Sequence, residues 1–473
     1  MTVIAHDPMF TPLRFRNLTV KNRLFRSSIS GRIDNYNGTG TRARINWERK
    51  FARGGVGAII SAHVPVHVRG RILPNYAFID HDRMIPFWHE VGEAVHEHDC
   101  AFILQLSHGG RQQDIGGVEN QGRLALSSTS RADSFQGIQC QAMTKRQIRQ
   151  VVGQFARGAE RARAAGLDGV ELHACNGYLI TQFLSSGIND RADEYGGPLV
   201  NRARLLLEII AAIRKAVGRD FHLQVKISAV DHNNAVTFWN KPGNTLEESI
   251  QVCQWVEAAG ADAIHVSTGS MFPHPINPAG QFPVRAALRT YDTMLSSGSH
   301  AVRNYLLFRN PLSEPLMKWL WTRTVGSRAP EGRNLHDAAA IRGAVSIPVL
   351  CTGGFQTASV IRRALADRQC DGVSMARPLM ANPDLPRMFA AGADRAERPC
   401  TYCNRCLFAV LEDPLGCYDV SRYDGDHDAM IREIMSIFEP ETTQSATAAR
   451  PRKQSRQNGR PARPAARRSR NVE

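Results

Sequence analysis

The segment Asp168–Arg204 reads DGVELHACNGYLITQFLSSGINDRADEYGGPLVNRAR, and it says more about the fold than any other stretch of the chain. An apolar run at its start predicts a buried strand, which ends in three hydrogen-bonding side chains, His173, Asn176 and Tyr178. Further apolar positions then lead into a turn-rich loop. We predict that the strand, its polar tip and this covering loop form part of an active site.

The three polar side chains suggest a definite chemistry. An imidazole, a carboxamide and a phenol so close together can hold a carbonyl oxygen while one of them supplies a proton. We therefore take His173, Asn176 and Tyr178 as candidate catalytic residues. The alternative is that His173 is an ordinary core histidine with a satisfied hydrogen bond. The downstream pattern N-x-R-x-D-x-Y-G-G-x-x-x-N-R, which runs from Asn189 to Arg202, weakens that alternative.

This combined pattern resembles the old yellow enzyme family of flavin-dependent oxidoreductases. The resemblance extends from about Phe10 to Phe389, apart from one long insertion, and includes the segment QLSHGGR that begins at Gln105. It implies a bound FMN, NAD(P)H as the reductant and a small-molecule substrate. Tyr178 would then be the proton donor, and His173 and Asn176 would polarise the carbonyl group of the substrate.

Apolar runs of strand length alternate with helical periods along the chain, which is typical of a parallel α/β sheet. Right-handed crossovers between such strands favour barrels or doubly wound sheets. The count of strands reaches eight, so we predict a (β/α)8 TIM barrel. The expected strands are Arg23–Arg26, Gly57–Val64, Cys100–Leu106, the run from Asp168, Phe221–Ser228, Ala261–Thr268, Ile347–Gly354 and Cys370–Arg377.

The resemblance also assigns residues to the flavin ring. It places Ser27, Ser28, Ile29 and Ser30 beside the ring, although a serine-rich turn is also an ordinary local structure. Gln105 carries a donor and an acceptor on one amide, which suits the pyrimidine edge of a flavin. Lys226 stands where relatives usually carry Arg, so it keeps the positive charge and loses the planar fork of donors.

A phosphate site is expected after the last two strands, where barrels often bind phosphate. Backbone N–H groups at Gly353 and Gly354, at the helix that follows them, and at Ala376 and Arg377 can cradle an anion. The glycine pair alone is a weak signal. The wider pattern TGG…ARPLMANPDLP resembles the FMN phosphate motif of the family.

The chain divides into a barrel, residues 1–395, a cysteine-rich segment, residues 396–440, and a basic tail, residues 441–473. Residues 269–344 are more than a βα connection needs, so we expect them to form an insertion that serves as a lid. The net charge is +15, and the final part from Arg450, with nine Arg or Lys and one Glu, carries +8 of it. The tail has no apolar periodicity, which predicts disorder.

Four cysteines follow the barrel in the pattern C-x2-C-x2-C-x10-C: Cys400, Cys403, Cys406 and Cys417. Four thiolates at such spacing can bind zinc or an iron–sulfur cluster, and metal-free thiols are the third alternative. The segment resembles the cluster-binding stretch of dienoyl-CoA reductase and trimethylamine dehydrogenase, which favours [4Fe–4S]. The further nucleotide-binding domains of those relatives have no counterpart in this sequence.

We therefore expect an FMN-dependent reductase of activated alkenes that uses NAD(P)H. The alternative enzyme is an amine or N-methyl dehydrogenase or demethylase that passes electrons from FMN through an iron–sulfur cluster to a partner protein. A non-enzymatic alternative is an interaction protein that uses its basic tail. The N-terminus has no apolar core of signal-peptide length and no window approaches 18 apolar residues, so we expect a cytoplasmic protein without membrane or nucleic-acid partners. The oligomeric state stays open.

Overall fold

The computed structural model describes residues 7–113, 120, 122–133, 137–235, 238–295 and 299–440. The chain up to Phe438 packs as one unit, and the remainder from Glu439 is a second. The predicted disorder of the basic tail, residues 441–473, therefore lies outside the described residues. None of the helices in the described part combines the length and the apolar character needed to cross a membrane.

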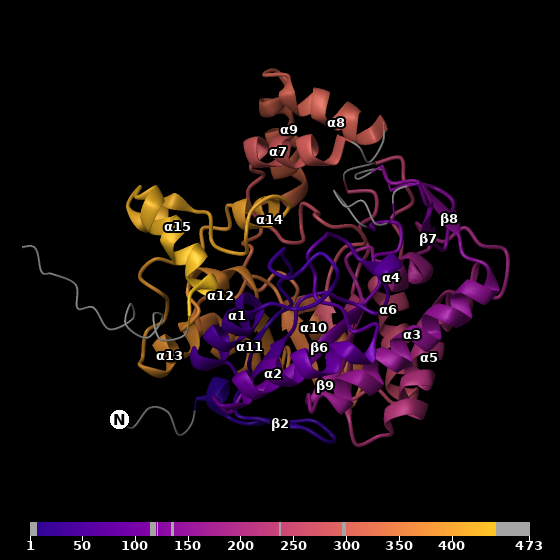
Figure 1. Ribbon diagram of the computed structural model, residues 1–473, viewed down its shortest axis with the longest axis horizontal. Helices are drawn as coiled ribbons and strands as arrows, with labels where there is room; N and C mark the ends of the chain where they lie inside the picture. Colours follow the sequence, from indigo (N-terminus) through magenta and orange to yellow (C-terminus); the bar gives the residue numbers. More distant parts are fainter. Residues whose placement is uncertain are drawn as a thin grey trace, which may run out of the picture. The chain divides into compact units, whose positions relative to one another are not determined.

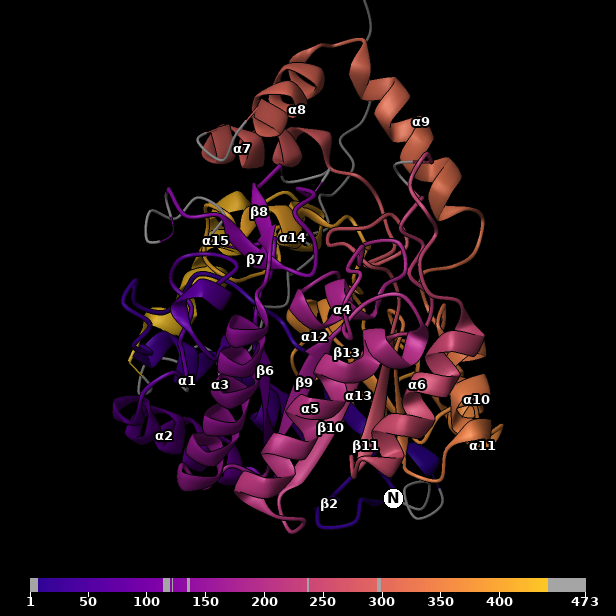
Figure 2. The same cartoon turned by 90° about the vertical axis from the view of Figure 1, so that its right-hand side faces the viewer.

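Eight parallel strands form a closed ring, so the predicted (β/α)8 barrel is confirmed (Figures 1 and 2). Each strand pairs with two neighbours, and the pairing of β4 with β6 closes the ring. The barrel strands are β3 (Leu24–Arg26), β4 (Ala58–Ile60), β6 (Ala101–Ser107), β9 (Gly169–Ala174), β10 (His222–Ser228), β11 (Ala263–Ser267), β12 (Val349–Thr352) and β13 (Gly372–Met375). A short strand, β5 (Val64–Pro65), adds to the edge of β6.

Helices return the chain between consecutive strands and surround the barrel (Figure 2). They are α1 (Arg42–Arg53), α2 (Ile85–His96), α3 (Lys145–Ala164), α5 (Leu199–Val217), α6 (Leu246–Ala258), α10 (Leu335–Ala344) and α11 (Ala358–Ala366), with α12 (Arg377–Ala381) and α13 (Leu385–Ala390) after the last strand. Two of them begin with reciprocal capping boxes, Thr144 with Gln147 on α3 and Thr245 with Glu248 on α6. These caps satisfy backbone N–H groups that have no partner within the helix.

The amino-terminal end of the barrel is closed by an antiparallel pair, β1 (Leu13–Arg14) and β2 (Thr19–Val20). Side chains from this pair and from the strands form a small apolar cluster that includes Phe15, Phe25 and Ile103. The interior of the barrel is therefore packed with side chains at this end. The opposite end, where the strands finish, is left for the site.

The long motif from Asn189 to Arg202 stabilises the loop after β9. A short helix, α4 (Leu179–Leu184), leads into the loop, where the amide of Asn189 donates to the carbonyls of Phe183 and Tyr195, both at 2.7 Å. Arg202 donates to the carbonyl of Leu184 at 2.8 Å and to the carboxylate of Glu248 on α6 at 2.6 Å. These residues brace the loop against the neighbouring helix.

The segment after β11 contains three additional helices, α7 (Val284–Met294), α8 (Ser299–Arg309) and α9 (Ser313–Val325). They project from the end of the barrel where the strands finish (Figure 2). On α9, Trp321 donates to the carbonyl of Gly280 at 2.9 Å and stacks on Phe282 with ring centroids 4.6 Å apart. Helix α10 packs on α6 and β12, so it is the helix of the barrel repeat and the extra residues end before Leu335.

The last described residues also pack on the barrel. Helix α14 (Arg405–Ala409) lies against α7, and α15 (His427–Met435) follows it. The side-chain amide of Asn46 on α1 donates to the carbonyl of Ile437 at 2.9 Å. The cysteine-rich segment is therefore close to both the barrel and the insertion.

A pair of short strands, β7 (Ala125–Ser127) and β8 (Cys140–Ala142), covers the barrel near α4.

Candidate active site

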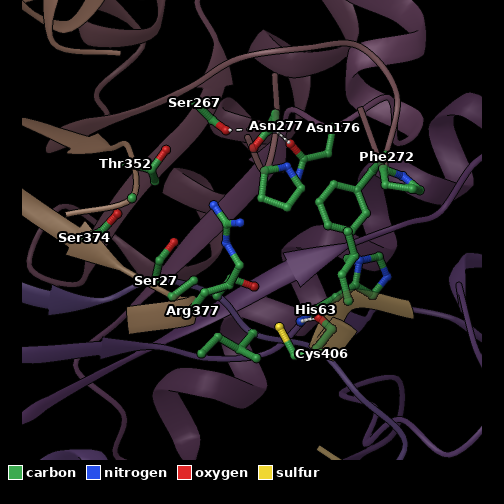
Figure 3. Close-up of a pocket in the computed structure, with 18 of the residues that line it drawn as sticks. Ser27, His63, Asn176, Ser267, Phe272, Asn277, Thr352, Ser374, Arg377 and Cys406 are labelled. Atoms are coloured by element: carbon green, nitrogen blue, oxygen red, sulfur yellow. Dashed lines mark hydrogen bonds between the residues drawn. The ribbon is translucent and has the colours of Figure 1, made fainter. Parts of the chain in front are cut away.

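A cavity of about 240 Å³ lies at the carboxyl ends of the barrel strands. This is the end at which barrel enzymes carry their active sites. Hydroxyl groups from four adjacent strands line one side of it: Ser27 after β3, Ser267 on β11, Thr352 on β12 and Ser374 on β13 (Figure 3). The candidate residues His173, Asn176, Tyr178, Lys226, Ser28, Ile29 and Ser30 also line this cavity.

The tip of β9 brings the three candidate catalytic side chains together. His173 is the penultimate strand residue, and the rings of His173 and Tyr178 meet edge to face with centroids 4.7 Å apart. The turn between them needs positive φ at Asn176 (61°) and Gly177 (76°). A Cβ at Gly177 would lie 2.1 Å from the carbonyl oxygen of Ser270, so only glycine fits there.

Hydrogen bonds orient the polar groups of this tip. The Oδ1 atom of Asn176 accepts from the side-chain amide of Asn277 at 2.8 Å, as Figure 3 shows, so the other end of this amide carries its N–H donors. The Nδ1 atom of His173 lies 3.5 Å from the thiol of Cys175. Burial, with a smaller contribution from the charge of Lys226, lowers the pKa of His173, and burial raises the pKa of Tyr178. At neutral pH the site therefore combines a neutral imidazole with a protonated phenol.

A fourth ring belongs to the same surface. His63, which follows β4, packs edge to face against Tyr178 at 5.3 Å and against His173 at 5.9 Å between ring centroids. We call His63, His173, Asn176 and Tyr178 the neutral wall. The sequence offered a signal for His63 that we did not use, since this histidine lies near the end of the predicted strand Gly57–Val64, where barrel residues can enter the site.

Lys226 lies beside the neutral wall because β10 aligns it with His173 on β9 and with His265 on β11. The side chain is 5% exposed, and its Nζ atom donates to the hydroxyl of Ser27 at 3.3 Å. None of the described residues that line the cavity is Asp or Glu. A cationic group in such a cavity favours a ligand with negative charge.

Directly below the cavity, a buried carboxylate joins several strands. Glu171 accepts hydrogen bonds from Gln105 (2.7 Å), Gln224 (2.5 Å) and Nδ1 of His265 (2.7 Å). Burial alone would raise the pKa of Glu171, but attraction to His265 and hydrogen bonding lower it. The carboxylate is therefore ionised, and it holds the surrounding side chains in fixed orientations.

Gln105 is part of this network and does not line the cavity itself. Its Nε2 atom donates to Glu171, and its Oε1 atom accepts from the hydroxyl of Ser28 at 2.8 Å. Ser28 lines the cavity, so it connects Gln105 and the buried network to the cavity wall. Contact between Gln105 and a flavin stays a prediction. The sequence reasoning had missed both Glu171 and His265, because their pairing joins residues that are 94 positions apart.

The glycine pair and the last strand form the other wall. Gly353, Gly354, Ala376 and Arg377 all line the cavity, as does Arg333 from the residues before α10. We call Gly353, Gly354, Arg333 and Arg377 the basic wall. The backbone N–H of Gly332 donates to the carbonyl of Gly353 at 2.7 Å, which holds the insertion against the glycine pair. Arg333 was not predicted as a site residue, because it is far from the glycine pair in the sequence and only the fold brings them to the same cavity.

The N-terminus of α11 differs from the expected phosphate cradle. The carboxylate of Glu331 accepts from the backbone N–H groups of Gln356 and Thr357, both at 2.7 Å. These donors are therefore already satisfied by an anionic side chain of the insertion. Positive charge at this wall comes instead from the guanidinium groups of Arg333 and Arg377.

Arg377 connects the cavity to the cysteine-rich segment. Its Nη1 atom donates to Oδ1 of Asn404 at 2.5 Å, and its guanidinium lies 5.1 Å from the ring centroid of Tyr402. Arg377 and Cys406 line the main cavity and also a second, smaller one. The two cavities therefore share a wall.

The smaller cavity is lined by the four cysteines Cys400, Cys403, Cys406 and Cys417, all of which are free thiols. Burial raises the pKa of Cys400 to about 11 and also raises that of Cys406. The volume between them is about 10 Å³. In the described part of the chain, no group of three or more His, Cys, Asp or Glu side chains is arranged to hold a metal ion. The donor set suits a metal, but the arrangement of the thiols does not.

Residues 8–302 match the model of the NADH:flavin oxidoreductase / NADH oxidase family, so the chain belongs to this family, as the sequence pattern indicated. The chain is 30% identical over 403 residues to an NADH oxidase of Thermoanaerobacter brockii, an alignment that covers 85% of this chain and 54% of that protein. It is 33% identical over 385 residues to an NADPH dehydrogenase of Halalkalibacterium halodurans, with 81% and 94% covered.

Among solved structures, a 2-naphthoyl-CoA reductase in complex with 2-naphthoyl-CoA superposes with a TM-score of 0.70 at 24% identity, covering 89% of this chain and 58% of that one. This similarity shows the shared fold. The chain spans little more than half the length of the NADH oxidase and of the naphthoyl-CoA reductase. The family and the barrel are therefore established.

Proposed function

We propose that the protein is an FMN-dependent oxidoreductase that uses NAD(P)H to reduce activated alkenes. The observation that carries the proposal is the neutral wall, where His173, Asn176 and a protonated Tyr178 face one cavity beside the cation of Lys226. A carbonyl-activated alkene requires donors at its oxygen and a proton source near its α-carbon. The neutral wall offers both.

The residues present fit FMN at two places. Lys226 and the hydroxyl row are suited to the polar edge and side chain of a flavin, and the basic wall is suited to a phosphate group. The lack of Asp and Glu among the described lining residues supports an anionic ligand. When bound, FMN would supply the hydride chemistry, taking a hydride from NAD(P)H and passing it to the alkene.

The side chains of this chain would perform the remaining steps. Asn176 and His173 bind the carbonyl oxygen and draw charge towards it, which makes the β-carbon electrophilic. Tyr178 holds a proton at its hydroxyl, since burial raises its pKa, and it would deliver this proton to the α-carbon. The edge-to-face contact of the two rings fixes their relative position.

The test is to purify the protein, identify the released flavin and measure reduction of cyclic enones with NADH and with NADPH. We expect FMN and not FAD, with enone reduction supported by at least one nicotinamide. Protein that binds no FMN after reconstitution would refute the proposal. An FMN-loaded protein that oxidises NAD(P)H and leaves all enones unchanged would refute only the alkene substrate.

A second candidate function has one observation in its favour, the shared wall that Cys406 and Arg377 form between the two cavities. In this alternative the four cysteines bind a [4Fe–4S] cluster, and an amine or N-methyl substrate gives up electrons to a partner protein. The thiols would have to separate to make room for a cluster. Iron, acid-labile sulfide and zinc analysis of anaerobically purified protein, beside assays with amines, tests this alternative.

A further inference from the structure

The helices α8 and α9 of the insertion expose an apolar surface. Of the fifteen large hydrophobic side chains that are exposed among the described residues, seven lie between positions 302 and 320. We call these seven the apolar tip: Val302, Leu306, Leu307, Leu312, Leu316, Trp319 and Leu320. Single exposed apolar side chains are ordinary on a protein surface, whereas a cluster of them marks a contact with another body.

The sequence of α9 explains why part of this surface points outwards. Leu316, Trp319 and Leu320 are three and four positions apart, so they share one face of the helix. Trp321 lies on another face, where it is buried and stacks on Phe282. The helix is therefore anchored through one face and leaves an apolar face free.

The apolar tip is attached close to the cavity. Phe272, before α7, lines the cavity, and so do Pro330 and Arg333 after α9. The ring of Phe282, which stacks on α9, also meets that of Phe408, another lining residue, with centroids 5.7 Å apart. Figure 2 shows α8 and α9 beyond the end of the barrel where the strands finish. A body that binds the apolar tip would therefore lie over the end of the barrel that carries the cavity.

Basic side chains accompany the apolar tip. Between positions 299 and 325 the sequence has one acidic residue, Glu314, and four basic ones, Arg303, Arg309, Lys318 and Arg323. The carboxylate of Glu314 accepts a hydrogen bond from Lys318 at 2.6 Å. The guanidinium of Arg323 lies 5.4 Å from the ring centroid of Trp319. The partner should therefore combine an apolar interior with a negatively charged surface.

We propose that the apolar tip is a docking surface for an anionic lipid bilayer. Its leucines and Trp319 insert among the lipid chains, and the basic side chains contact the lipid phosphate groups. Leucine and tryptophan on one face with Lys and Arg beside them is the composition of helices that lie in a membrane interface. Energetically important contacts between proteins contain few leucines, whereas five of the seven residues of the apolar tip are leucine.

A second copy of this chain fits the apolar tip less well. A two-fold contact would place the same surface of each copy against the other, and so bring like charges together. A bilayer has no such cost, and it needs no complementary shape. An interfacial helix also needs neither the length nor the overall hydrophobicity of a spanning helix. The expectation of no membrane partner considered only spanning segments and signal peptides, and the docking does not depend on the reaction that the enzyme performs.

The first experiment is flotation of the whole chain with vesicles made of equal parts phosphatidylcholine and phosphatidylglycerol. We expect the protein to float with these vesicles. Leu312→Gln and Leu316→Gln should each weaken binding by about 10-fold, since each takes an apolar side chain out of the lipid. The matched control is Val200→Gln on the barrel helix α5, because Val200 and Leu316 are both 53% exposed. This control should bind like the unmodified protein.

A second pair of variants tests the charge. Arg309→Gln should weaken binding to the same vesicles by about fivefold, the usual worth of one basic residue near an anionic surface. Its control is Arg219→Gln, which changes an exposed residue between α5 and β10, at the amino-terminal end of the strand. The basic tail also attracts anionic lipid. It is present in all of these proteins, so differences between them report the apolar tip.

Fluorescence shows whether the apolar tip enters the lipid. Phospholipids with brominated acyl chains should quench the tryptophan fluorescence, and Trp319→Phe should remove most of this quenching. Failure of the unmodified protein to bind the anionic vesicles overturns the proposal. Binding that is unchanged in Leu312→Gln and Leu316→Gln overturns it as well, since charge alone would then attract the protein. If light scattering shows a dimer that these two variants dissociate, the apolar tip is an interface between copies and the proposal fails.

Discussion

The two walls of the cavity face each other, since β9 and β13 are four strands apart in the closed ring of eight, and they are built in opposite ways. The neutral wall comes mainly from the tip of one strand, β9, and burial keeps His63 and His173 uncharged. The basic wall is assembled from the glycine pair, the last strand and an insertion. Local sequence patterns therefore predict most of the neutral wall, which is proposed to supply the proton. The basic wall, which is proposed to bind negative charge, depends on contacts between segments that are distant in the sequence.

The largest expected effect is at the proton donor of the neutral wall. Tyr178→Phe keeps the ring contacts with His173 and His63 and removes the hydroxyl. Reoxidation of the reduced enzyme by an enone should slow by about 10² to 10⁴, while reduction by NAD(P)H is unchanged. Stopped-flow measurement of the two half-reactions checks this prediction.

The control for that experiment is Tyr195→Phe. Tyr195 is also buried, but its hydroxyl donates to Glu208 at 3.0 Å and it does not line the cavity. Both half-reactions should retain their rates in this variant. An unaltered enone half-reaction in Tyr178→Phe would mean that water or another residue supplies the proton.

The second effect concerns Glu171, which lies below both walls. Glu171→Gln removes the buried charge that accepts a hydrogen bond from His265 and attracts Lys226, and losing a hydrogen bond to such a charged group costs about 1–3 kcal/mol of unfolding free energy. The pKa of Glu171 is lowered in the fold, so the stability that it contributes is complete above its ordinary value of 4.5 and is lost as the pH falls through the folded value. The difference from the unmodified protein should therefore shrink below pH 4.5.

Denaturant unfolding between pH 4 and pH 8 measures this difference, with Glu160→Gln on the exposed face of α3 as the control. The control should match the unmodified protein across the whole range. A constant loss in Glu171→Gln down to the lowest pH would show that folding does not lower the pKa of Glu171.

Particular residues show how far the sequence could predict this molecule. The eight strands and the caps at Thr144 and Thr245 follow from local periodicity and from side chains three positions apart, so they were predictable. The tip from His173 to Tyr178 is equally local. The long motif after it was interpreted as covering an active site, yet Asn189 and Arg202 brace a loop and do not line the cavity.

What could not be predicted depends on contacts between distant segments. Arg333 reaches the glycine pair, and Glu331 occupies the N–H groups of α11, only because the insertion folds back on the barrel. Nothing in the periodicity of residues 269–344 specifies that contact. The spacing of the four cysteines likewise predicted ligands, but it did not specify how closely their side chains would pack.

A smaller effect, on the affinity for FMN, is expected from substitutions in the basic wall. Arg377→Ala and Arg333→Ala should each weaken FMN binding by about 10- to 100-fold, the usual worth of a hydrogen bond to a charged group. Riboflavin, which lacks the phosphate, should bind as it does to the unmodified protein. Fluorescence titration of the flavin-free protein with both flavins checks the prediction.

Arg328→Ala is the matched control, since Arg328 is an exposed residue of the same insertion and does not line the cavity. It should leave both affinities unchanged. If Arg333→Ala weakens riboflavin and FMN equally, Arg333 acts by holding the insertion in place and not through the phosphate.

The smallest effect is expected where the two cavities meet. Cys403→Ser removes one of the four thiols and does not touch the neutral wall, because Cys403 lines only the smaller cavity. If the four cysteines bind a [4Fe–4S] cluster, the unmodified protein should contain about four iron and four sulfide per chain, and the variant should lose both. Enone turnover and FMN content should stay within about twofold, because hydride transfer to carbon needs no one-electron carrier. Metal and sulfide analysis beside enone assays decides the point: turnover lost with FMN and fold retained would make the cysteines part of the reaction and favour the amine dehydrogenase alternative.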